Sequence, residues 1–368
     1  MKKVLATLLC LSLLLCTACS AGAPQVTDPV ETTEATKPGA EIFTDELKAK
    51  LDDILEQQAF QGLVSLGCSG QTVYEWVAGT DELAEPLTMD SAMCIGSNSK
   101  QFCAASILML RDQGKLSLDD SLEKYFPEYT IGKDVSLHHL LSMQSGIVRD
   151  PLELAENMEQ YFNQSAEENL AALKAWVFEQ PLQFTPGSQF EYSNVNYILL
   201  SCVVEQVSGQ RYADFVRKNI FEPLGMGHSY LIEDLRDNPQ LGIISENLEW
   251  YHAPGSAQGA GDIIATADDM QLWMQGLQRG QVVSMESYRA MTTFHSASYG
   301  YGLTRGSRGG YAHNGYIGTY TSEVYFNEEY GYQLFLVTNK ASPYNVGITG
   351  KVKDALLKTV FEAADALV

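Results

Sequence analysis

Strand-like segments lie near both ends of this chain, and helical segments occupy the long stretch between them. A hairpin is predicted over residues 63–68 and 72–78, around Ser69-Gly70-Gln71. Strand-like runs rich in Tyr, Val and Phe return late in the chain, at 310–313, 320–327 and 332–338. Strands at both ends imply one antiparallel sheet that the C-terminal half completes.

The middle of the chain is predicted to be helical. Apolar residues recur there at helical spacing, and Gly or Pro ends each run. The expected helices cover 98–113, 137–143, 166–180, 195–207 and 267–278, with further helices around 47–55 and at 351–367. The predicted class is therefore α/β in its α+β form, an antiparallel sheet flanked by helices plus a mostly helical subdomain.

Composition and charge exclude several classes of protein. With 45% hydrophobic and 19% charged residues among 368, the chain has the composition of a globular protein. Seven cysteines are too few for a small disulfide scaffold. A formal net charge of -22 repels phosphates, which makes a nucleic-acid partner improbable.

Residues 1–19 have the pattern of a lipoprotein signal peptide. Two lysines precede an apolar run at 4–15, which is too short to span a membrane. The run leads to Cys16-Thr17-Ala18-Cys19, which resembles the bacterial lipoprotein box with Cys19 as the lipidated residue. We therefore expect an exported protein, lipid-anchored to the extracytoplasmic face of a bacterial membrane and touching the membrane only through that anchor. The alternative is cleavage at a nearby alanine, which releases a secreted protein.

Residues 20–41 are predicted to form a flexible tether. This segment consists mainly of Ala, Thr, Pro, Glu and Gly and has almost no large apolar side chain to bury. No second linker of this kind and no repeat period follow it. Residues 42–368 are therefore expected to form one catalytic domain.

The first chemical motif is Ser97-Asn98-Ser99-Lys100. Ser97 and Lys100, at i and i+3 on the first turn of the predicted helix, share one face, so the amine can reach the hydroxyl. The helix N-terminus and burial both favour a neutral lysine, which can take the proton from the serine. The same spacing recurs at Ser121 and Lys124, where three acidic residues indicate a surface turn.

Two further motifs follow in order along the chain. Tyr192-Ser193-Asn194 lies at the start of a predicted helix, and His313-Asn314-Gly315 lies on a late strand. With the Ser-x-x-Lys motif, they make this chain resemble the serine beta-lactamase-like hydrolases, which include class C beta-lactamases, D-alanyl-D-alanine carboxypeptidases of the penicillin-binding type, and family VIII-type esterases. The resemblance extends over about residues 45 to 365 and implies the beta-lactamase/transpeptidase-like fold.

The resemblance implies a role for each motif residue. Ser97 would be the nucleophile, Lys100 its base, and Tyr192 the phenol that passes the proton to the leaving group. Asn194 would bind the substrate amide and His313 would line the opposite wall. Gly315 would let the ligand approach the strand, and the backbone N–H groups of Ser97 and Tyr316 would form the oxyanion hole. This mechanism requires no cofactor and no metal.

The departures from the family pattern bear on the substrate. Where beta-lactamases have Lys-Thr-Gly, this chain has His-Asn-Gly, which disfavours beta-lactam hydrolysis as its main task. A histidine is largely neutral at pH 7 and would bind a substrate carboxylate weakly, so Arg305 or Arg308 is an alternative source of charge. The leading expectation is a D-Ala-D-Ala carboxypeptidase-like hydrolase of cell-wall peptides. The alternatives are an esterase or amidase of the same fold, and a sensor that binds a beta-lactam or stem peptide with little turnover.

Other reactive side chains receive structural interpretations. His138 and His139 lack spaced carboxylate or cysteine partners, so a metal site there is improbable. Four cysteines, at positions 68, 94, 103 and 202, lie in predicted strands or apolar helices. Export permits a disulfide, and the sequence leaves their pairing open.

Overall fold

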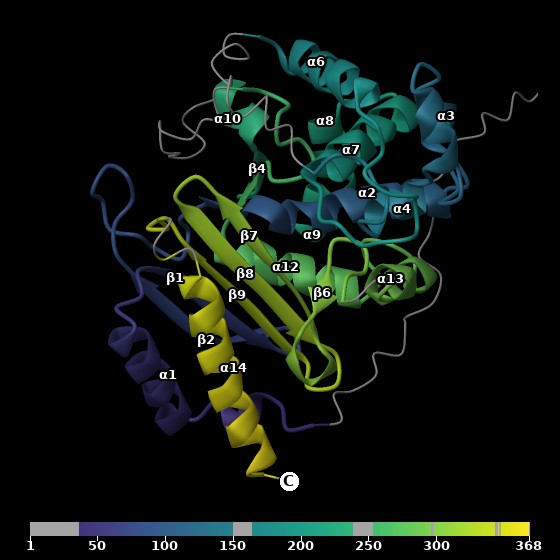
Figure 1. The fold of residues 1–368 in the computed structure, drawn as a ribbon. Coiled ribbons are helices and arrows are strands. Elements are labelled where there is room, and N and C mark those ends of the chain that lie inside the picture. The colour runs from purple at the N-terminus through teal and green to yellow at the C-terminus, as the bar shows by residue number, and fades with distance from the viewer. Residues whose placement is uncertain are drawn as a thin grey trace, which may run out of the picture. The chain divides into compact units, whose positions relative to one another are not determined.

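The computed structural model describes residues 37–149, 164–237, 253–295, 298–342, 345 and 347–367 (Figure 1). The predicted signal peptide, Cys19 and most of the predicted tether lie outside the described residues. Tyr332 donates a hydrogen bond from its hydroxyl to the Pro38 carbonyl at 2.7 Å, so contacts with the fold begin a few residues before position 42. Among the described residues, no helix is both long and apolar enough to cross a membrane.

A six-stranded antiparallel sheet joins the two ends of the chain, in the order β2-β1-β9-β8-β7-β6. The pairing of β1 with β9 places Leu63 opposite Val337, which are 274 positions apart in sequence, and this confirms the predicted completion of the sheet. All residues of β1, β8 and β9 are buried, as expected for central strands covered on both faces. The strands are β1 (Gly62–Cys68), β2 (Gln71–Ala78), β6 (Thr304–Arg305), β7 (Tyr311–Ile317), β8 (Tyr320–Asn327) and β9 (Tyr332–Thr338).

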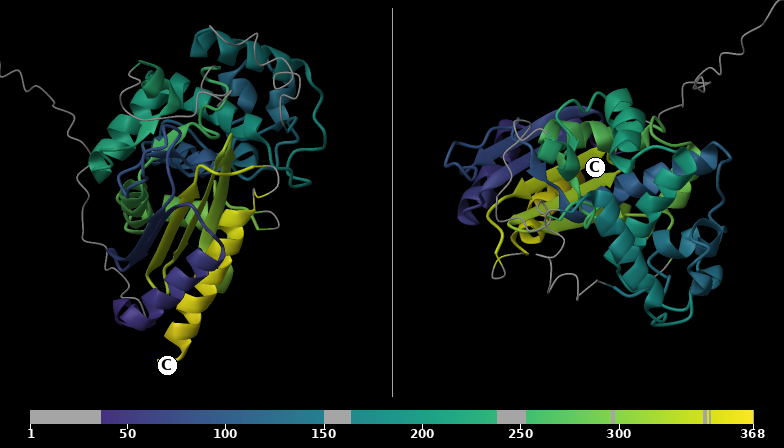
Figure 2. Two further views of the ribbon diagram at one scale, coloured as in Figure 1. Left: turned by 90° about the vertical axis from the view of Figure 1, so that its left-hand side faces the viewer. Right: turned by 90° about the horizontal axis from the view of Figure 1, so that it is seen from above.

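One face of the sheet is covered by the first and last long helices, α1 (Asp45–Gln57) and α14 (Ile348–Asp365), which contact each other (Figures 1 and 2). The Thr44 hydroxyl caps α1 by accepting a hydrogen bond from the Leu47 N–H. Leu51 and Leu55 bury one stripe of α1 in the same apolar cluster as Leu356 of α14. The helix predicted at 351–367 starts three residues earlier and ends two residues earlier.

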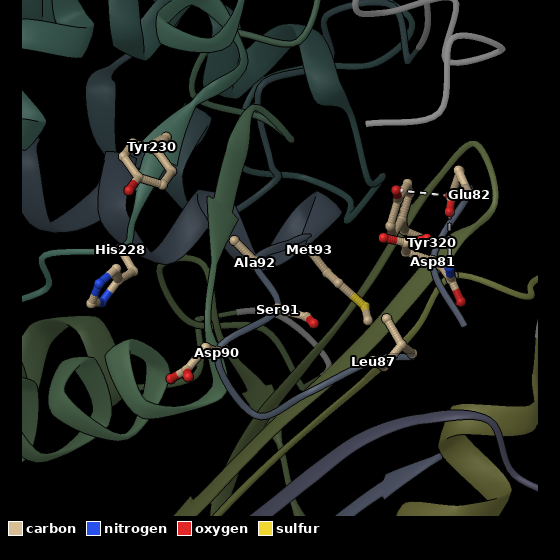
Figure 3. Close-up of a pocket in the computed structure, with 11 residues that line it drawn as sticks. Asp81, Glu82, Leu87, Asp90, Ser91, Ala92, Met93, His228, Tyr230 and Tyr320 are labelled. Carbon is tan, nitrogen blue, oxygen red and sulfur yellow. Dashed lines mark hydrogen bonds between the residues drawn. The ribbon is translucent and has the colours of Figure 1, made fainter. Parts of the chain in front are cut away.

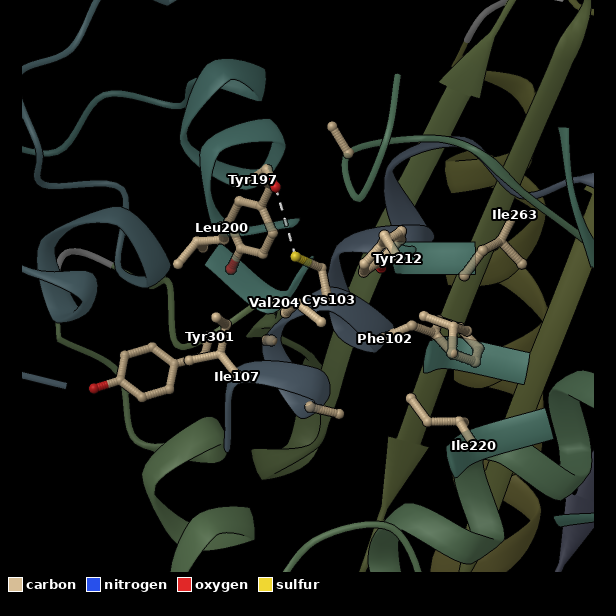
Figure 4. Close-up of a cluster of buried hydrophobic side chains, with 14 of the residues drawn as sticks. Phe102, Cys103, Ile107, Tyr197, Leu200, Val204, Tyr212, Ile220, Ile263 and Tyr301 are labelled. Carbon is tan, nitrogen blue, oxygen red and sulfur yellow. Dashed lines mark hydrogen bonds between the residues drawn. The ribbon is translucent and has the colours of Figure 1, made fainter. Parts of the chain in front are cut away.

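The other face carries the helical part of the molecule, centred on α2 (Ser99–Asp112). Nearly every residue of α2 is buried, and Figure 4 shows Phe102, Cys103 and Ile107 among side chains from neighbouring helices. Phe102 stacks on Trp273 with ring centroids 3.8 Å apart. In the described ranges, the other α-helices of four or more residues are α3 (Leu122–Tyr125), α4 (Leu137–Leu141), α6 (Ala166–Glu179), α7 (Asn194–Ser208), α8 (Tyr212–Val216), α10 (Ile232–Asp237), α12 (Ala267–Gln278) and α13 (Met285–Thr292). They confirm the mostly helical subdomain.

The sequence analysis missed a second, three-stranded antiparallel sheet of order β3-β5-β4. Its strands, β3 (Met93–Cys94), β5 (Ile263–Ala265) and β4 (Tyr230–Leu231), have two or three residues each, too few to show a period. This sheet ties the segment before α2 to the segment around residue 263.

The four described cysteines are buried free thiols, at positions 68, 94, 103 and 202. Burial is the main cause that raises the pKa of each of them, so each is a thiol rather than a nucleophilic thiolate near neutral pH.

Candidate active site

Ser97 lies in a tight turn between the small sheet and α2. The chain passes from β3 into a 3-10 turn, η2 (Gly96–Asn98), and then into α2, so Ser97 precedes the α-helix instead of occupying its first turn. Gly96 has φ +52°, and a Cβ there would lie 2.7 Å from the backbone N of Tyr316. This turn therefore requires glycine, and the close packing brings β7 against the serine.

Lys100 lies in the first turn of α2 and is fully buried. Its Nζ lies 3.0 Å from Ser97 Oγ, 2.8 Å from Asn194 Oδ1 and 2.7 Å from the Ala260 carbonyl oxygen. A neutral amine has two N–H donors and one lone pair. If Asn194 and Ala260 accept the two hydrogens, the lone pair is left to accept the Ser97 proton.

The Tyr192-Ser193-Asn194 segment is held by the loop that follows α4. The Ser193 N–H donates to the Met143 sulfur at 3.4 Å, and the Glu191 N–H donates to the Met143 carbonyl at 2.9 Å. Lys100 Nζ lies 4.9 Å from the centroid of the Tyr192 ring. Lys100 therefore lies beside the Tyr192 ring in the site.

Strand β7 forms the opposite side of the site. A Cβ on Gly315 would lie 1.9 Å from the Ile95 carbonyl oxygen and 2.6 Å from Ser322 Oγ. The sequence analysis explained this glycine by approach of the ligand, whereas the structure shows that the nucleophile turn itself occupies the space. The same packing puts the backbone N of Tyr316 beside Gly96, the residue before Ser97.

A pocket of about 190 Å³ opens at the serine. Its lining is mostly small or apolar, and Ser97 and Asn194 contribute polar groups. The lining residues are Ser97, Asn194, Ile198, Ser256, Ala257, Ala260, Gly261, Tyr316, Ile317 and Gly318. The pocket therefore offers hydrogen bonds at the reacting end and apolar contact beyond it.

His313 is 3% exposed and packs against Tyr299 and Tyr192. Its Nδ1 lies 2.7 Å from the Asn314 carbonyl oxygen, which makes Nδ1 the protonated nitrogen, and Nε2 lies 3.3 Å from the Tyr299 hydroxyl, which can donate to it. Burial, together with the charge of Lys100, lowers the pKa of His313 to about 3. His313 is therefore an uncharged part of the wall.

The two arginines that could replace the charge of His313 have other partners. Arg308 forms an ion pair with Asp365 at 2.7 Å, near the end of α14, and its guanidinium lies over the Phe361 ring. Arg305 lies over the Phe294 ring at 4.4 Å. Neither contact directs a guanidinium toward Ser97.

Sequence reasoning missed the role of the Ala260 carbonyl and the chemistry of Asp262. A backbone acceptor such as the Ala260 carbonyl leaves no signal in a sequence. Asp262 is buried, and its Oδ1 accepts no hydrogen bond within the described part of the chain. Burial raises the pKa of Asp262 to about 7, although backbone N–H groups and the charge of Lys100 act in the opposite direction.

The histidines at 138 and 139 have structural partners. His138 Nδ1 lies 2.7 Å from the Tyr301 hydroxyl. His139 takes part in the capping box of α4, where its Nδ1 accepts from the Ser136 N–H. Within the described ranges, no group of three or more His, Cys, Asp or Glu residues is arranged to hold a metal ion.

Comparison with known proteins gives a consistent result. A family model described as Beta-lactamase matches residues 47–357. The putative penicillin-binding protein PbpX of Bacillus subtilis is 29% identical over 285 residues, which cover 73% of this chain and 68% of that protein. The D-aminopeptidase of Brucella anthropi is 30% identical over 68% of this chain, but this match spans only 49% of the relative.

Solved structures show the same fold. A D-amino acid amidase from Ochrobactrum anthropi SV3, complexed with L-phenylalanine, superposes with a TM-score of 0.72 at 23% identity, covering 88% of this chain and 99% of the other. An octameric penicillin-binding protein homologue from Pyrococcus abyssi superposes with a TM-score of 0.68 at 24% identity, covering 84% and 77%.

Proposed function

The chain belongs to the beta-lactamase family, which comprises serine hydrolases, and from this premise we propose that it acts through an acyl-enzyme on Ser97. The observation that carries the proposal is the position of Lys100 Nζ, 3.0 Å from Ser97 Oγ, with Asn194 and Ala260 as its other acceptors. This arrangement supports removal of the serine proton by the neutral amine as Oγ attacks a carbonyl carbon.

The later steps use the groups around the serine. The oxyanion of the tetrahedral intermediate would accept hydrogen bonds from the N–H groups of Ser97 and Tyr316. The proton taken by Lys100 would pass through the Tyr192 hydroxyl to the leaving group, whose bond to the carbonyl carbon then breaks. Water, deprotonated by the same groups, would hydrolyse the ester on Ser97 and regenerate the enzyme.

For the substrate, we propose an amide or ester of a D-amino acid or short peptide whose recognition needs no free carboxylate. Support comes from the neutral, buried His313 and from the other contacts of Arg305 and Arg308. The similarity to a D-aminopeptidase points the same way. This reverses the order expected from the sequence, where a D-Ala-D-Ala carboxypeptidase came first. That activity remains the second candidate, favoured by the similarity to a penicillin-binding protein.

The location of the protein is also a proposal. The apolar run at 4–15, which follows two lysines and leads to Cys19, supports export and lipid anchoring on the extracytoplasmic face of a bacterial membrane. Such anchoring would place the domain beside cell-wall peptides.

The test of the mechanism measures steady-state hydrolysis of a chromogenic ester and covalent labelling by a fluorescent penicillin. We expect Ser97→Ala to abolish labelling and to reduce ester turnover by about 10³-fold or more. Ser121→Ala changes the other Ser-x-x-Lys sequence and should leave both signals unchanged. Labelling that persists in Ser97→Ala would refute the site. A single acylation of the wild type without turnover would instead identify a sensor.

A further inference from the structure

Tyr299 lies outside the catalytic motifs but stands between the two sides of the active site. It is buried, with 2% of its surface exposed. Its ring packs edge-on against Tyr192, with ring centroids 6.1 Å apart and an angle of 84° between the ring planes. It also packs edge-on against His313 of β7, at 5.8 Å and 78°. Tyr299 therefore connects the segment before α7 with β7.

The Tyr299 hydroxyl has a partner inside this contact. It lies 3.3 Å from His313 Nε2 and can donate to it, because the ring proton is on Nδ1, 2.7 Å from the Asn314 carbonyl oxygen. Hydrogen bonds at both ring nitrogens fix the plane of the imidazole. The His313 ring in turn packs against Tyr192, with centroids 6.2 Å apart. Tyr299 thus contacts Tyr192 directly through its ring and indirectly through His313.

The backbone around Tyr299 is packed against the helix that carries the lysine. The Tyr299 carbonyl accepts a hydrogen bond from the His295 N–H at 3.0 Å, and Tyr299 forms an isolated antiparallel bridge with Thr304. Three residues later, Gly302 has φ +70°, and a Cβ there would lie 2.8 Å from the Lys100 carbonyl oxygen. This close packing requires glycine and holds the Tyr299 segment against α2.

We propose that Tyr299 is a positioning residue for acyl transfer, which holds Tyr192 where its phenol can protonate the leaving group. This role rests on the proposed function. As Ser97 Oγ bonds to the carbonyl carbon, the bond from that carbon to the leaving oxygen breaks. The leaving oxygen then takes, through Tyr192, the proton that Lys100 removed from the serine. A positioned general acid contributes about 100-fold or more to the rate, and a displaced one loses part of this factor.

The test compares the p-nitrophenyl ester and the ethyl ester of N-acetyl-D-alanine. Both esters form the same acyl-enzyme, so they differ only in the leaving group. The p-nitrophenolate ion leaves without help from an acid, whereas ethoxide needs a proton. The ratio of kcat/KM for the ethyl ester to kcat/KM for the p-nitrophenyl ester therefore measures proton delivery. This ratio also cancels any loss of correctly folded enzyme.

Two substitutions at Tyr299 should lower this ratio to different extents. Tyr299→Leu removes the ring beside Tyr192 and should lower the ratio about tenfold. Tyr299→Phe keeps the ring and loses only the hydrogen bond to His313, so the ratio should fall about threefold. A ratio unchanged in both variants would overturn the proposal. If Tyr299→Leu does not fold, an unchanged ratio in Tyr299→Phe has the same consequence.

Two buried tyrosines outside this contact provide matched controls. Tyr301 is 3% exposed, and its hydroxyl lies 2.7 Å from His138 Nδ1 (Figure 4). Tyr320 is also 3% exposed and donates to Glu82 Oε1 at 3.0 Å, in a pocket of about 220 Å³ that shares no lining residue with the catalytic pocket (Figure 3). Tyr301→Phe and Tyr320→Phe should leave the ratio unchanged. A threefold fall in both controls would show a general effect of removing a buried hydroxyl and would overturn the proposal.

A spectroscopic measurement tests the hydroxyl contact without relying on activity. In nitrogen NMR of protein with isotope-labelled histidine rings, Tyr299→Phe should move the His313 Nε2 signal toward that of a nitrogen without a hydrogen bond. Tyr301→Phe should move a His138 signal and leave His313 unchanged. The loss of a signal in His313→Asn identifies His313. A His313 signal that does not move in Tyr299→Phe would overturn the hydroxyl contact.

The outcomes separate this inference from the proposed function. If the wild type hydrolyses neither ester, the proposed function is refuted, and the positioning role is refuted with it even where the His313 signal moves as expected. If the wild type hydrolyses both esters and the ratio does not respond to substitution of Tyr299, only the positioning role is refuted.

Discussion

His313 should contribute no positive charge to substrate binding, and replacing it with lysine should create that charge. The pKa of His313 is lowered to about 3 by burial and by Lys100. Since one pKa unit corresponds to about 1.4 kcal/mol, protonating His313 at pH 7 costs about 5 kcal/mol. A hydrogen bond to a charged group contributes only about 1.5 to 3 kcal/mol. A substrate carboxylate therefore does not protonate this histidine.

The assay compares kcat/KM for two substrates on each variant, a D-Ala-D-Ala peptide with a free carboxylate and a neutral ester. The ratio of the two values cancels any loss of correctly folded enzyme. His313→Lys should raise the peptide-to-ester ratio by about five- to thirtyfold, which corresponds to about 1 to 2 kcal/mol. This is less than the full strength of the new charge interaction, because burial of the lysine side chain beside Lys100 offsets part of it. His313→Asn, which is neutral, should leave the ratio unchanged.

The pH dependence of the wild type provides an independent check. Because His313 stays neutral, the peptide-to-ester ratio should be flat between pH 5 and pH 8. A ratio that rises several-fold on acidification would mean that the histidine protonates in the complex, and the reasoning from burial would be wrong. A ratio that does not change in His313→Lys would mean that position 313 does not face the substrate carboxylate.

Two other predictions concern groups outside the catalytic set. The pKa of Asp262 is raised from 3.8 to about 7, so its contribution to stability is fully present below about pH 4 and is lost as the pH rises through 7. In the wild type, the raised pKa of Asp262 should lower the free energy of unfolding by about 1.4 kcal/mol for each pH unit between about pH 4 and 7. Asp262→Asn should remove this pH dependence, as measured by urea denaturation of both proteins across that range. Identical slopes in the two proteins would contradict the raised pKa. Cys19→Ala should move the protein from the membrane fraction to the soluble fraction and remove the mass of the lipid, and unchanged partitioning and mass would refute the lipoprotein interpretation.

The local pattern of the sequence determined the long elements and the first catalytic pair. Apolar spacing predicted α7 and α12 to within one residue at each end, because a helix is set by contacts three and four positions apart. The separation of only three residues also placed Ser97 and Lys100 together, although Ser97 lies in the 3-10 turn that precedes the α-helix. The order of the three motifs was enough to indicate the family.

Tertiary structure decided everything that depends on residues far apart in sequence. Asn194 and the Ala260 carbonyl reach Lys100 from 94 and 160 positions away, and only the packing of the loop around residue 260 on α2 brings that carbonyl into place. The depressed pKa of His313 is a property of burial, which a single residue in a sequence does not show. Gly315 was recognised from its motif, but the carbonyl that makes it necessary belongs to Ile95, 220 positions earlier. Local propensity acts over a few residues, whereas desolvation and close packing are set by the whole fold.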